Sequence, residues 1–469
     1  MRGHCQRIFE GKTRGVKVRT ITVKELLSAV GGTLLTGSME TKIASVSTDS
    51  RTAGEGALFV PLVGERFDGH DYIGKALTAG AAGCLCVRVP AELQEGKFYV
   101  QVADTMRALK ALASWYRGEF DIPFVQVTGS VGKTTAKEMI ACVLSQHFRT
   151  LKTDANFNNE IGTPQTLLRL SPEHQAAVIE TGMDHAGQIR YLGEMVRPQI
   201  AVITNVGDAH IEFFGSRRGI LAAKCEIFEN LSAGGLAVLN GDDELLNTVT
   251  LPQRIIRCGV GETCDVRVKN IVDRGMDGVT CDVITTQHNY HLDIPAPGKH
   301  MIYPASFAVA IGEALGLSEA EIVRGVAAYE PAGSRMHVIR LSEGRRLLDD
   351  CYNANPQSVE ASLRVLSSSE GKKVAVLGDM AELGELTEAA HEKIGKLTKE
   401  LEIDQVIAIG VKAKHLAENA AENALWFASV PEALAAIDAA FTPGSAMLVK
   451  ASHSMHFEQI VKEFSKEQA

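Results

Sequence analysis

The sequence predicts an α/β protein of three domains: a small N-terminal α/β domain, a central domain with a parallel sheet, and a C-terminal Rossmann-like domain. Its 469 residues are about three times the ~150 residues typical of one domain. Short apolar runs alternate with stretches of helical periodicity, which is typical of parallel sheets covered by helices on both faces. One apolar strand also leads through a glycine-rich loop into a helix, the order found where helices bind phosphate.

The composition excludes several classes of protein. Hydrophobic residues make up 45% and charged residues 22% of the chain, values typical of a soluble globular protein. The 48 basic and 57 acidic residues give a formal charge of −9, which repels nucleic acid. No apolar stretch approaches the ~20 residues that cross a bilayer, so we expect no membrane insertion. The nine scattered cysteines, without a Cys-x-x-Cys pair, favour reduced thiols and a cytoplasmic location over structural zinc.

The N-terminal part of the chain divides into an extension and a small domain. Residues 1–18 carry basic side chains without periodicity, so we expect a loose extension there. The N-terminal domain is predicted over residues 19–118. It begins with a short helix after Thr22 and continues with strand-like runs such as Ala57–Leu62.

The rest of the chain is predicted to form two further α/β domains, over residues 119–331 and 332–469. The strands expected in the central domain are Ile122–Val127, Ala177–Ile179, Ile200–Ile203 and Leu236–Leu239, followed by a helical run over Ala305–Leu315. The strands expected in the C-terminal domain are Lys373–Leu377, Gln405–Ile409 and Ala446–Val449. Their alternation with helices suggests a second doubly wound sheet.

The strongest local signal is the loop after the first central strand. Its residues are Thr128, Gly129, Ser130, Val131, Gly132, Lys133 and Thr134. Glycines let backbone N–H groups approach a phosphate chain, the next helix adds its N-terminal dipole, and Lys133 supplies a compact cation. Thr134 would offer its hydroxyl to Mg²⁺. Val127 stands where the usual spacing has a first glycine, so the sequence predicts a shortened P-loop and a central ATPase domain.

Three further residues are candidates for a metal site beside this loop. Taken alone, each has an ordinary interpretation: Glu180 as a solvated strand end, His210 as a structural loop residue, and Lys224 as a helix-surface cation paired with a carboxylate. Glu180 and His210, however, each follow a strand that should end at the same edge of the sheet as the loop. A divalent cation on phosphate oxygens needs such side chains, so we expect Thr134, Glu180, His210 and Lys224 to serve it.

At this point the residues resemble a known family. The glycine loop, the run Asn156–Pro164, Glu180, the segment ending at His210 and the pair Lys224-x-Glu226 are similar to the central domain of the Mur ligases, the ATP-dependent amino-acid-adding enzymes of peptidoglycan synthesis. The resemblance covers nearly all of the chain from about residue 20.

Motifs in the two outer domains resemble particular members of this family. Thr48–Arg51 and Phe67–Asp71 look like the uridine-nucleotide domain of two members of the family. Asp349–Pro356 and Leu377–Glu385, with His391, resemble a single member that adds a dipeptide.

The resemblance implies ATP and Mg²⁺ as cofactors, and UDP-N-acetylmuramoyl-tripeptide and D-alanyl-D-alanine as co-substrates that are joined through an acyl phosphate. It implies catalytic roles for Lys133, His210 and Lys224, the last often carbamylated in the family. Arg335 and Asp350 match positions that contact the nucleotide, as the loop residues do. We expect substrate contacts from Thr48, Ser50, Arg51, Asn353 and Asn355, and a monomeric protein.

Two departures from the family pattern leave contacts open. Gly298-Lys299-His300 is followed by Met301 and Pro304, where members have asparagines near the adenine. The usual Lys-Gly-Ser-Arg reads Lys450–His453, which replaces an arginine by a histidine. The alternatives are a sister ligase that adds a diamino acid, a folylpolyglutamate synthetase-like ligase and, from another class, a P-loop regulatory NTPase. The sequence does not distinguish diaminopimelate from lysine in the tripeptide.

Overall fold

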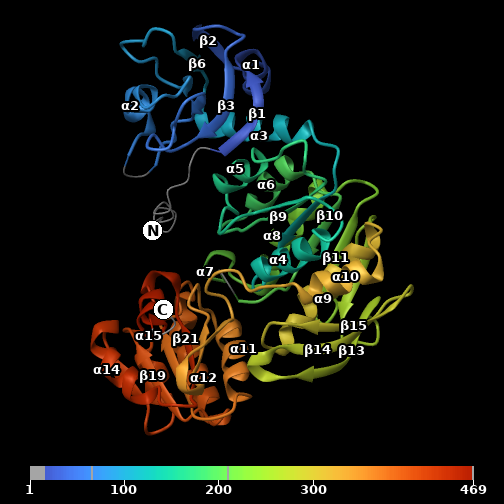
Figure 1. Cartoon of the computed structure of the whole chain (residues 1–469), viewed down its shortest axis with the longest axis vertical. Coiled ribbons are helices and arrows are strands. Elements are labelled where there is room, and N and C mark those ends of the chain that lie inside the picture. Colours follow the sequence, from blue (N-terminus) through green and yellow to red (C-terminus); the bar gives the residue numbers. More distant parts are fainter. Residues whose placement is uncertain (1–15, 65–66, 209–210, 467–469) are drawn as a thin grey trace. The chain divides into compact units, whose positions relative to one another are not determined.

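The computed structural model describes residues 16–64, 67–208 and 211–466. Residues 1–15 of the expected extension and the expected metal ligand His210 lie outside the described residues. The chain forms two compact units, each made of separate stretches of sequence (Figure 1). The first unit comprises Met1–Phe124, Arg149–Thr181 and Arg190–Pro198, and the second comprises Val125–Phe148, Gly182–Ile189 and Gln199–Ala469.

The first unit contains a six-stranded sheet in the order β1-β3-β4-β5-β6-β2, with parallel strands in its centre and an antiparallel strand at each edge. The strands are β1 (Val16–Thr22), β2 (Thr33–Thr36), β3 (Lys42–Ser47), β4 (Ala57–Phe59), β5 (Gly83–Cys86) and β6 (Phe98–Gln101). The helices are α1 (Val23–Val30), η1 (Gly69–Tyr72), α2 (Ile73–Thr78) and α3 (Thr105–Gly118). Residues 16–18, which we expected in the extension, belong instead to β1 because they pair with β3.

Helix α1 confirms the helix predicted after Thr22. The Thr22 hydroxyl accepts a hydrogen bond from the Glu25 backbone N–H at 3.2 Å, and the Glu25 carboxylate accepts one from the Thr22 N–H at 2.7 Å. This reciprocal arrangement is a capping box, and it satisfies two N–H groups that the first turn leaves without a helical partner. Hydrogen bonds from Thr22 hold the pKa of the Glu25 carboxyl below its usual value.

The hydrophobic core of the first unit joins distant parts of the chain. The unit also contains the parallel pair β8 (Thr150–Lys152) and β9 (Ala176–Glu180), helix α5 (Gly162–Leu167) and most of α6 (Gln188–Val196). Buried side chains of α3, such as Leu109 and Leu112, share one cluster with Leu168, Leu192 and Val196. The first core therefore includes residues on both sides of residue 118.

The second unit begins with a sheet whose strands run in the order β15-β14-β13-β12-β11-β10-β7. They are β7 (Phe124–Thr128), β10 (Ile200–Ile203), β11 (Leu236–Asn240), β12 (Arg254–Gly259), β13 (Val266–Asp273), β14 (Val279–Ile284) and β15 (Asn289–Ile294). The pairs from β7 to β13 are parallel, as predicted. Strands β13, β14 and β15 pair antiparallel, an extension of the sheet that the sequence analysis did not predict. In β14 the buried side chains of Val279, Cys281 and Val283 alternate with partly buried ones.

Helices of this part of the chain connect the strands or pack on them. They are α4 (Lys133–Leu144), α7 (Ile211–Phe214), α8 (Arg217–Cys225), α9 (Ile302–Ala314) and α10 (Glu319–Ala327), with short 3-10 turns η2 (Glu226–Asn230), η3 (Leu246–Thr248), η4 (Gly275–Asp277) and η5 (Lys299–Met301). Within the described residues, no helix is long and apolar enough to cross a membrane.

The last stretch of the second unit is a six-stranded sheet in the order β16-β17-β21-β18-β19-β20. Its strands are β16 (His337–Arg340), β17 (Arg346–Asp349), β18 (Lys373–Gly378), β19 (Gln405–Ile409), β20 (Leu425–Phe427) and β21 (Ala446–Lys450). All pairs are parallel except β16 with β17. The helices are α11 (Pro356–Ser367), α12 (Thr387–Glu400), α13 (Lys414–Asn419), α14 (Val430–Ala440) and α15 (Glu458–Phe464), with turns η6 (Ser342–Gly344), η7 (Gly384–Leu386) and η8 (His453–Met455).

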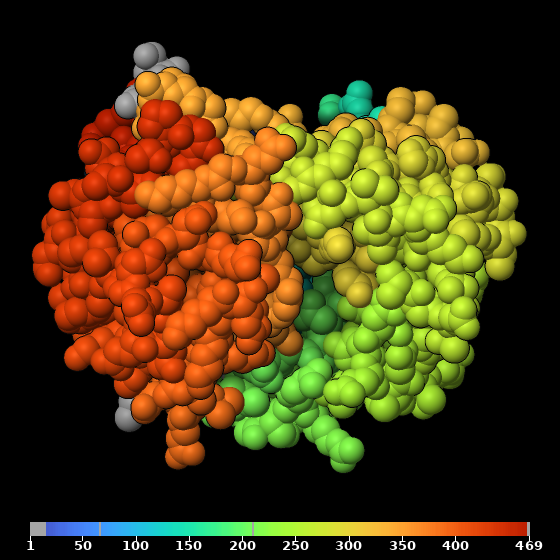
Figure 2. Space-filling view, turned by 90° about the horizontal axis from the view of Figure 1, so that it is seen from below, coloured from blue at the N-terminus to red at the C-terminus, as the bar shows by residue number. Residues whose placement is uncertain are grey.

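Successive side chains of β18 enter different cores. Val374 and Val376 belong to one buried cluster, whereas Ala375 and Leu377 belong to another. A strand buried on both faces is a continuous apolar run, which is how β18 was recognised. The structure thus confirms a doubly wound sheet here, and Figure 2 shows the orange and red residues of this segment as one continuous stretch of surface.

Candidate functional site

The glycine loop has the backbone geometry of an anion site. It follows β7 and turns at Gly129, with φ of +155°, and at Gly132, with φ of +78°. A Cβ at Gly129 would lie 1.9 Å from the Thr204 hydroxyl oxygen, so only glycine fits there. No side chain of the described residues caps α4 at Gly132. Backbone N–H groups at such a helix start attract anions.

Lys133, the first residue of α4, extends back over the loop. Its Nζ donates to the carbonyl oxygens of Gly129 at 2.9 Å and Ser130 at 3.3 Å. Carbonyl oxygens stabilise a cation without neutralising it, so these two bonds leave the positive charge at the loop. Thr134, the other polar residue predicted for this site, is buried in the first turn of α4.

A polar segment after β10 anchors the loop, and the sequence reasoning did not select it as functional. The Asn205 side chain hydrogen-bonds both backbone groups of Val131, accepting from its N–H at 3.0 Å and donating to its oxygen at 2.9 Å. The Thr204 hydroxyl donates to the same oxygen at 2.6 Å. A signal was present, because both residues follow a parallel strand and so lie at the edge where the loop begins.

Lys224 is not the helix-surface cation of its ordinary interpretation. The residue lies on α8 with only 1% of its surface exposed. Among the described residues, no hydrogen bond or ion pair reaches its Nζ, and Glu226 accepts a hydrogen bond from the Gly187 N–H at 2.7 Å. Burial, and then the charge of Lys133, hold the pKa of Lys224 well below its usual value. The second unit therefore brings two lysines to the loop, one of them without a carboxylate partner among these residues.

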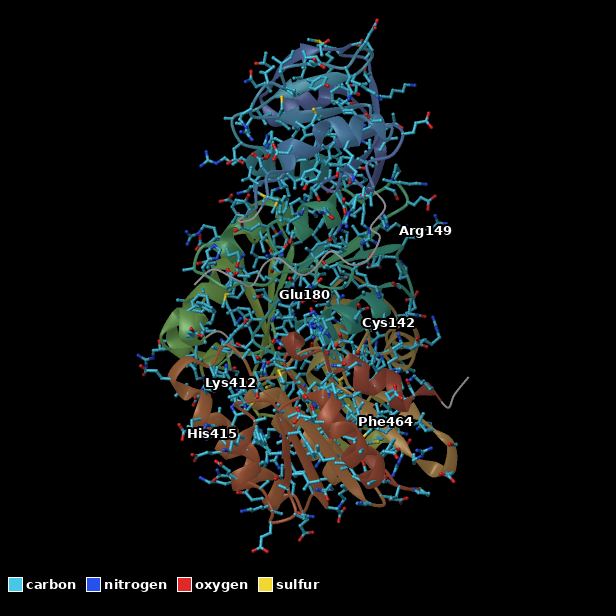
Figure 3. All side chains as sticks on the ribbon, turned by 90° about the vertical axis from the view of Figure 1, so that its left-hand side faces the viewer. Cys142, Arg149, Glu180, Lys412, His415 and Phe464 are labelled. Atoms are coloured by element: carbon cyan, nitrogen blue, oxygen red, sulfur yellow. The ribbon has the colours of Figure 1, made fainter. Side chains whose placement is uncertain are left out.

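Glu180 ends β9 in the first unit and is also buried, with 1% of its surface exposed. Its Oε1 accepts a hydrogen bond from the Asn158 side-chain amide at 2.9 Å. Its Oε2 has no hydrogen-bond partner among the described residues. Glu180 is labelled in Figure 3 near the middle of the view. The solvated strand end was thus the wrong alternative, because a buried carboxylate oxygen without a partner is suited to a ligand.

The described residues contain no cluster of three or more His, Cys, Asp or Glu side chains that could hold a metal ion. The metal ligands predicted from sequence lie in different parts of the chain. Thr134 and Lys224 belong to the second unit, Glu180 belongs to the first, and His210 lies outside the described residues.

The C-terminal candidates form a buried polar cluster at the ends of β17 and β21. Asp350 accepts hydrogen bonds from the Lys450 Nζ at 2.5 Å, the Ser362 hydroxyl at 2.6 Å and the Met336 N–H at 3.1 Å. Lys450 also donates to the Asn353 carbonyl oxygen at 3.0 Å. Through these hydrogen bonds the Asp350 carboxylate holds in place the residues that follow β17.

The other candidates of this segment lie around that cluster. The Arg335 guanidinium lies 3.7 Å from the ring centre of Tyr352, whose ring in turn lies 5.4 Å from that of His453. The Asn355 side chain accepts a hydrogen bond from the Ser358 N–H at 2.9 Å and so caps α11. Sequence reasoning did not foresee that cap, although an asparagine directly before a proline at the first helical position is a known start signal.

The expected substrate residues of the first unit have local partners. The Thr48 hydroxyl accepts a hydrogen bond from the Gln165 side-chain amide at 3.1 Å. Ser50 is buried, whereas the Arg51 side chain is exposed and forms an ion pair with Asp49 at 2.7 Å. The Arg51 side-chain hydrogen bonds hold the pKa of the Asp49 carboxyl below its usual value.

The fold and the loop define a P-loop phosphate-binding protein with three α/β sheets. Three family models match the chain: the Mur ligase family catalytic domain over residues 42–117, the Mur ligase middle domain over residues 127–312, and the Mur ligase glutamate ligase domain over residues 334–453. Together with the relatives below, these matches show that the chain belongs to the Mur ligase family.

The most similar relatives agree with one another. The UDP-N-acetylmuramoyl-tripeptide--D-alanyl-D-alanine ligases of Bacillus subtilis and Escherichia coli are each 36% identical to this chain, covering 94% of it and 98% of the relative. Among solved structures, one of MurF from Acinetobacter baumannii matches 96% of this chain and 100% of its own at 33% identity, with a TM-score of 0.90. One of MurF ligase from Thermotoga maritima in complex with ADP matches 90% and 97% at 28% identity, with a TM-score of 0.81.

Proposed function

We propose that this chain is an ATP-dependent ligase that joins D-alanyl-D-alanine to UDP-N-acetylmuramoyl-tripeptide for peptidoglycan synthesis. One structural observation carries the nucleotide part of the proposal: the glycine loop leads into the start of α4, which has no side-chain cap among the described residues, and Lys133 donates to two carbonyl oxygens of that loop. Such an arrangement is suited to a polyphosphate, because a helix start and a compact cation both attract anions. The names and coverage of the relatives in Bacillus subtilis and Escherichia coli support the substrates.

The proposed reaction has two steps. The terminal carboxylate of the tripeptide attacks the γ-phosphorus of ATP, which forms an acyl phosphate and releases ADP. The amine of D-alanyl-D-alanine then attacks the acyl carbon, so that an amide bond forms, phosphate leaves and the amine loses a proton. The first step brings two anions together, and we propose that Lys133 offsets their repulsion. Arg335 and Asp350 are proposed to contact the nucleotide.

We propose Mg²⁺ as the metal, held by Thr134, Glu180, His210 and a carbamate on Lys224. The residues fit this ion, since Mg²⁺ prefers oxygen ligands and Glu180 offers a buried oxygen without a partner among the described residues. Bound Mg²⁺ would supply charge to offset that of the phosphate oxygens.

We also propose domain boundaries after residues 118 and 331, with β1 as the first strand of the N-terminal domain. The three ranges matched by the family models, 42–117, 127–312 and 334–453, support the two inner boundaries. A monomer in the cytoplasm completes the proposal, with substrate contacts from Thr48, Ser50, Arg51, Asn353 and Asn355.

A coupled phosphate-release assay tests the function. The purified protein is incubated with ATP, Mg²⁺, UDP-N-acetylmuramoyl-tripeptide and D-alanyl-D-alanine, with each omitted in turn, and the product is identified by mass. We expect phosphate release only when both co-substrates are present, and release to stop on chelation of the metal. Slow release with ATP alone, unchanged by the co-substrates, would instead identify a regulatory NTPase. Tripeptides containing diaminopimelate or lysine, compared in parallel, determine the third residue.

A further inference from the structure

The segment Thr204–Gly207 is bonded to the phosphate loop at several points. Besides the two hydrogen bonds between the Asn205 side chain and Val131, the Asn205 carbonyl oxygen accepts from the Ser130 N–H at 3.1 Å. The Gly207 N–H donates to the Ser130 hydroxyl at 2.9 Å. Asn205 thus fixes two consecutive loop residues through both its backbone and its side chain.

These bonds determine which loop amides can meet a phosphate. The N–H groups of Ser130 and Val131 are already donated to Asn205. An anion at the loop must therefore be bound by the N–H groups from Gly132 onward, at the start of α4, together with Lys133. The shortened loop, which lacks the usual first glycine, has correspondingly fewer amides to offer.

The same segment is tied to the helix that carries Lys224. The Val206 carbonyl oxygen accepts a hydrogen bond from the guanidinium of Arg217, the first residue of α8, at 2.9 Å. The Val206 N–H donates to the Asp243 carboxylate at 2.8 Å. A continuous path of hydrogen bonds therefore runs from α8 through Val206 and Asn205 to Val131, and both lysines of the site lie on elements that this path connects.

We infer that Asn205 is a positioning residue of the ligase, which sets the phosphate loop against α8 and so fixes the binding of the nucleotide phosphates. The inference rests on the proposed function only for the identity of the nucleotide. A side-chain amide suits the role because it accepts and donates at once, and so satisfies both backbone groups of Val131. An aspartate of the same shape can accept from the N–H but cannot donate to the oxygen.

The test is ADP binding by calorimetry together with steady-state kinetics on the full-length protein. For Asn205→Ala we expect ADP binding to weaken about tenfold, because two neutral hydrogen bonds are lost. We expect a similar rise in KM for ATP, with the KM for D-alanyl-D-alanine unchanged. Asn205→Asp should bind ADP no better than Asn205→Ala, although it preserves the packing. A residue needed only for packing would show the opposite order.

A matched control is Asn247→Ala. The Asn247 side-chain amide also donates to a backbone oxygen of the second unit, that of Gly241 at 2.7 Å, but has no bond to the loop. It should leave ADP affinity unchanged. ADP binding within twofold of wild type in folded Asn205→Ala and Asn205→Asp would overturn the inference. If Asn205→Ala does not fold, ADP binding by Asn205→Asp and Thr204→Val is measured instead: weaker binding supports the inference, and binding within twofold of wild type overturns it.

The readout separates this inference from the proposed function. ADP binding is measured without ligation, so a wild-type protein that binds ADP through Asn205 but forms no product would refute the ligase reaction and leave the positioning role standing. A wild-type protein that binds no ADP would overturn both.

Discussion

The two lysines proposed for the site, Lys133 and Lys224, have different surroundings. Lys133 donates to carbonyl oxygens of its own loop, whereas Lys224 is buried on α8 and lacks an acceptor among the described residues. An unpaired ammonium in the interior is costly, so it either shifts to the neutral amine or acquires an anion. The two side chains therefore predict different responses to substitution.

Replacing Lys133 should abolish ligation and leave the fold intact. Its side chain belongs to a ligand loop and not to a hydrophobic core, so Lys133→Ala should unfold at nearly the wild-type temperature while releasing no phosphate with both co-substrates. Lys462→Ala, which removes an exposed lysine of α15, is the control and should remain active. Phosphate release near the wild-type rate by folded Lys133→Ala would contradict the assignment of the loop.

Lys224→Ala should lose turnover through loss of the proposed carbamate. Carbamate formation joins the neutral amine to CO₂ and releases a proton, and the lowered pKa of the buried Lys224 increases the neutral fraction. A small carboxylic acid such as acetate should partly restore activity by occupying the vacated space. The control is Lys269→Ala, which removes an exposed lysine of β13 and should leave turnover unchanged with or without acetate. Full activity of Lys224→Ala at saturating Mg²⁺ and ATP would reject the role.

Sequence reasoning predicted both lysines for the site, and its ordinary alternative for Lys224, a helix-surface cation, was wrong. The loop is a local pattern, so strand, glycines and Lys133 can be read along the chain. The burial of Lys224 is not a local pattern, and Lys133, whose charge acts on it, lies far from it in the sequence. The Asn205 bonds were missed for the same reason, since 74 positions separate Val131 from Asn205.

At the scale of elements, α11 shows how one residue can have two interpretations. Asn355 was selected as a substrate contact, and in the structure its side chain starts the helix, with Ser358 Oγ in turn accepting from the Asn355 N–H at 3.1 Å. The side-chain oxygen is therefore engaged in the capping box. A substrate contact at this position would have to use the remaining amide hydrogens.

The cap gives a stability prediction. Asn355→Ala should lower the free energy of unfolding by about 0.5–2 kcal/mol, the usual cost of losing an N-cap. Asn355→Ser should recover most of this loss, because serine also accepts from the third helical N–H. Urea unfolding of the three proteins measures the difference. A serine variant as unstable as the alanine variant would show that the cap does not stabilise α11.

The strands that are buried most completely were predicted most accurately. The runs Ile200–Ile203 and Gln405–Ile409 correspond to β10 and β19 residue for residue, because continuous apolar runs have clear ends. The antiparallel extension β13–β15 was not predicted. Its strands alternate buried and exposed side chains, and charged residues such as Lys269 and Asp282 interrupt the apolar signal.

At the scale of the whole molecule, the chain returns to its first unit twice. The N-terminal sheet alone does not complete the core of that unit, because Leu168, Leu192 and Val196 fill it from later stretches. Motifs placed a boundary near residue 118, and motifs report where chemistry lies along the chain. They do not report which apolar faces share a core, so this interleaving was invisible in the sequence.

The segment 119–331, separated from the residues before it, should consequently fail to fold cooperatively. Removal of α3 exposes the side chains that Leu109 and Leu112 cover, and several such losses of about 2–5 kcal/mol exceed the stability of a typical domain. The matched control is the segment 332–469, whose two cores are almost entirely its own, and which should unfold cooperatively. Thermal unfolding followed by circular dichroism compares them. A sharp transition in the first and none in the second would contradict the prediction.

Because the first unit is built from separate stretches of sequence, its core cannot be completed until the last of them has been translated. Residue 198, the end of its last stretch, leaves the ribosome 80 residues after residue 118. At about 5–20 residues per second this is a delay of roughly 4–16 s, far longer than the collapse of a small chain. During that interval the apolar face of α3 has no native partner on the later stretches. The nascent chain thus carries an unfinished core through much of its translation, and the rate of elongation becomes a determinant of how much protein reaches the native state.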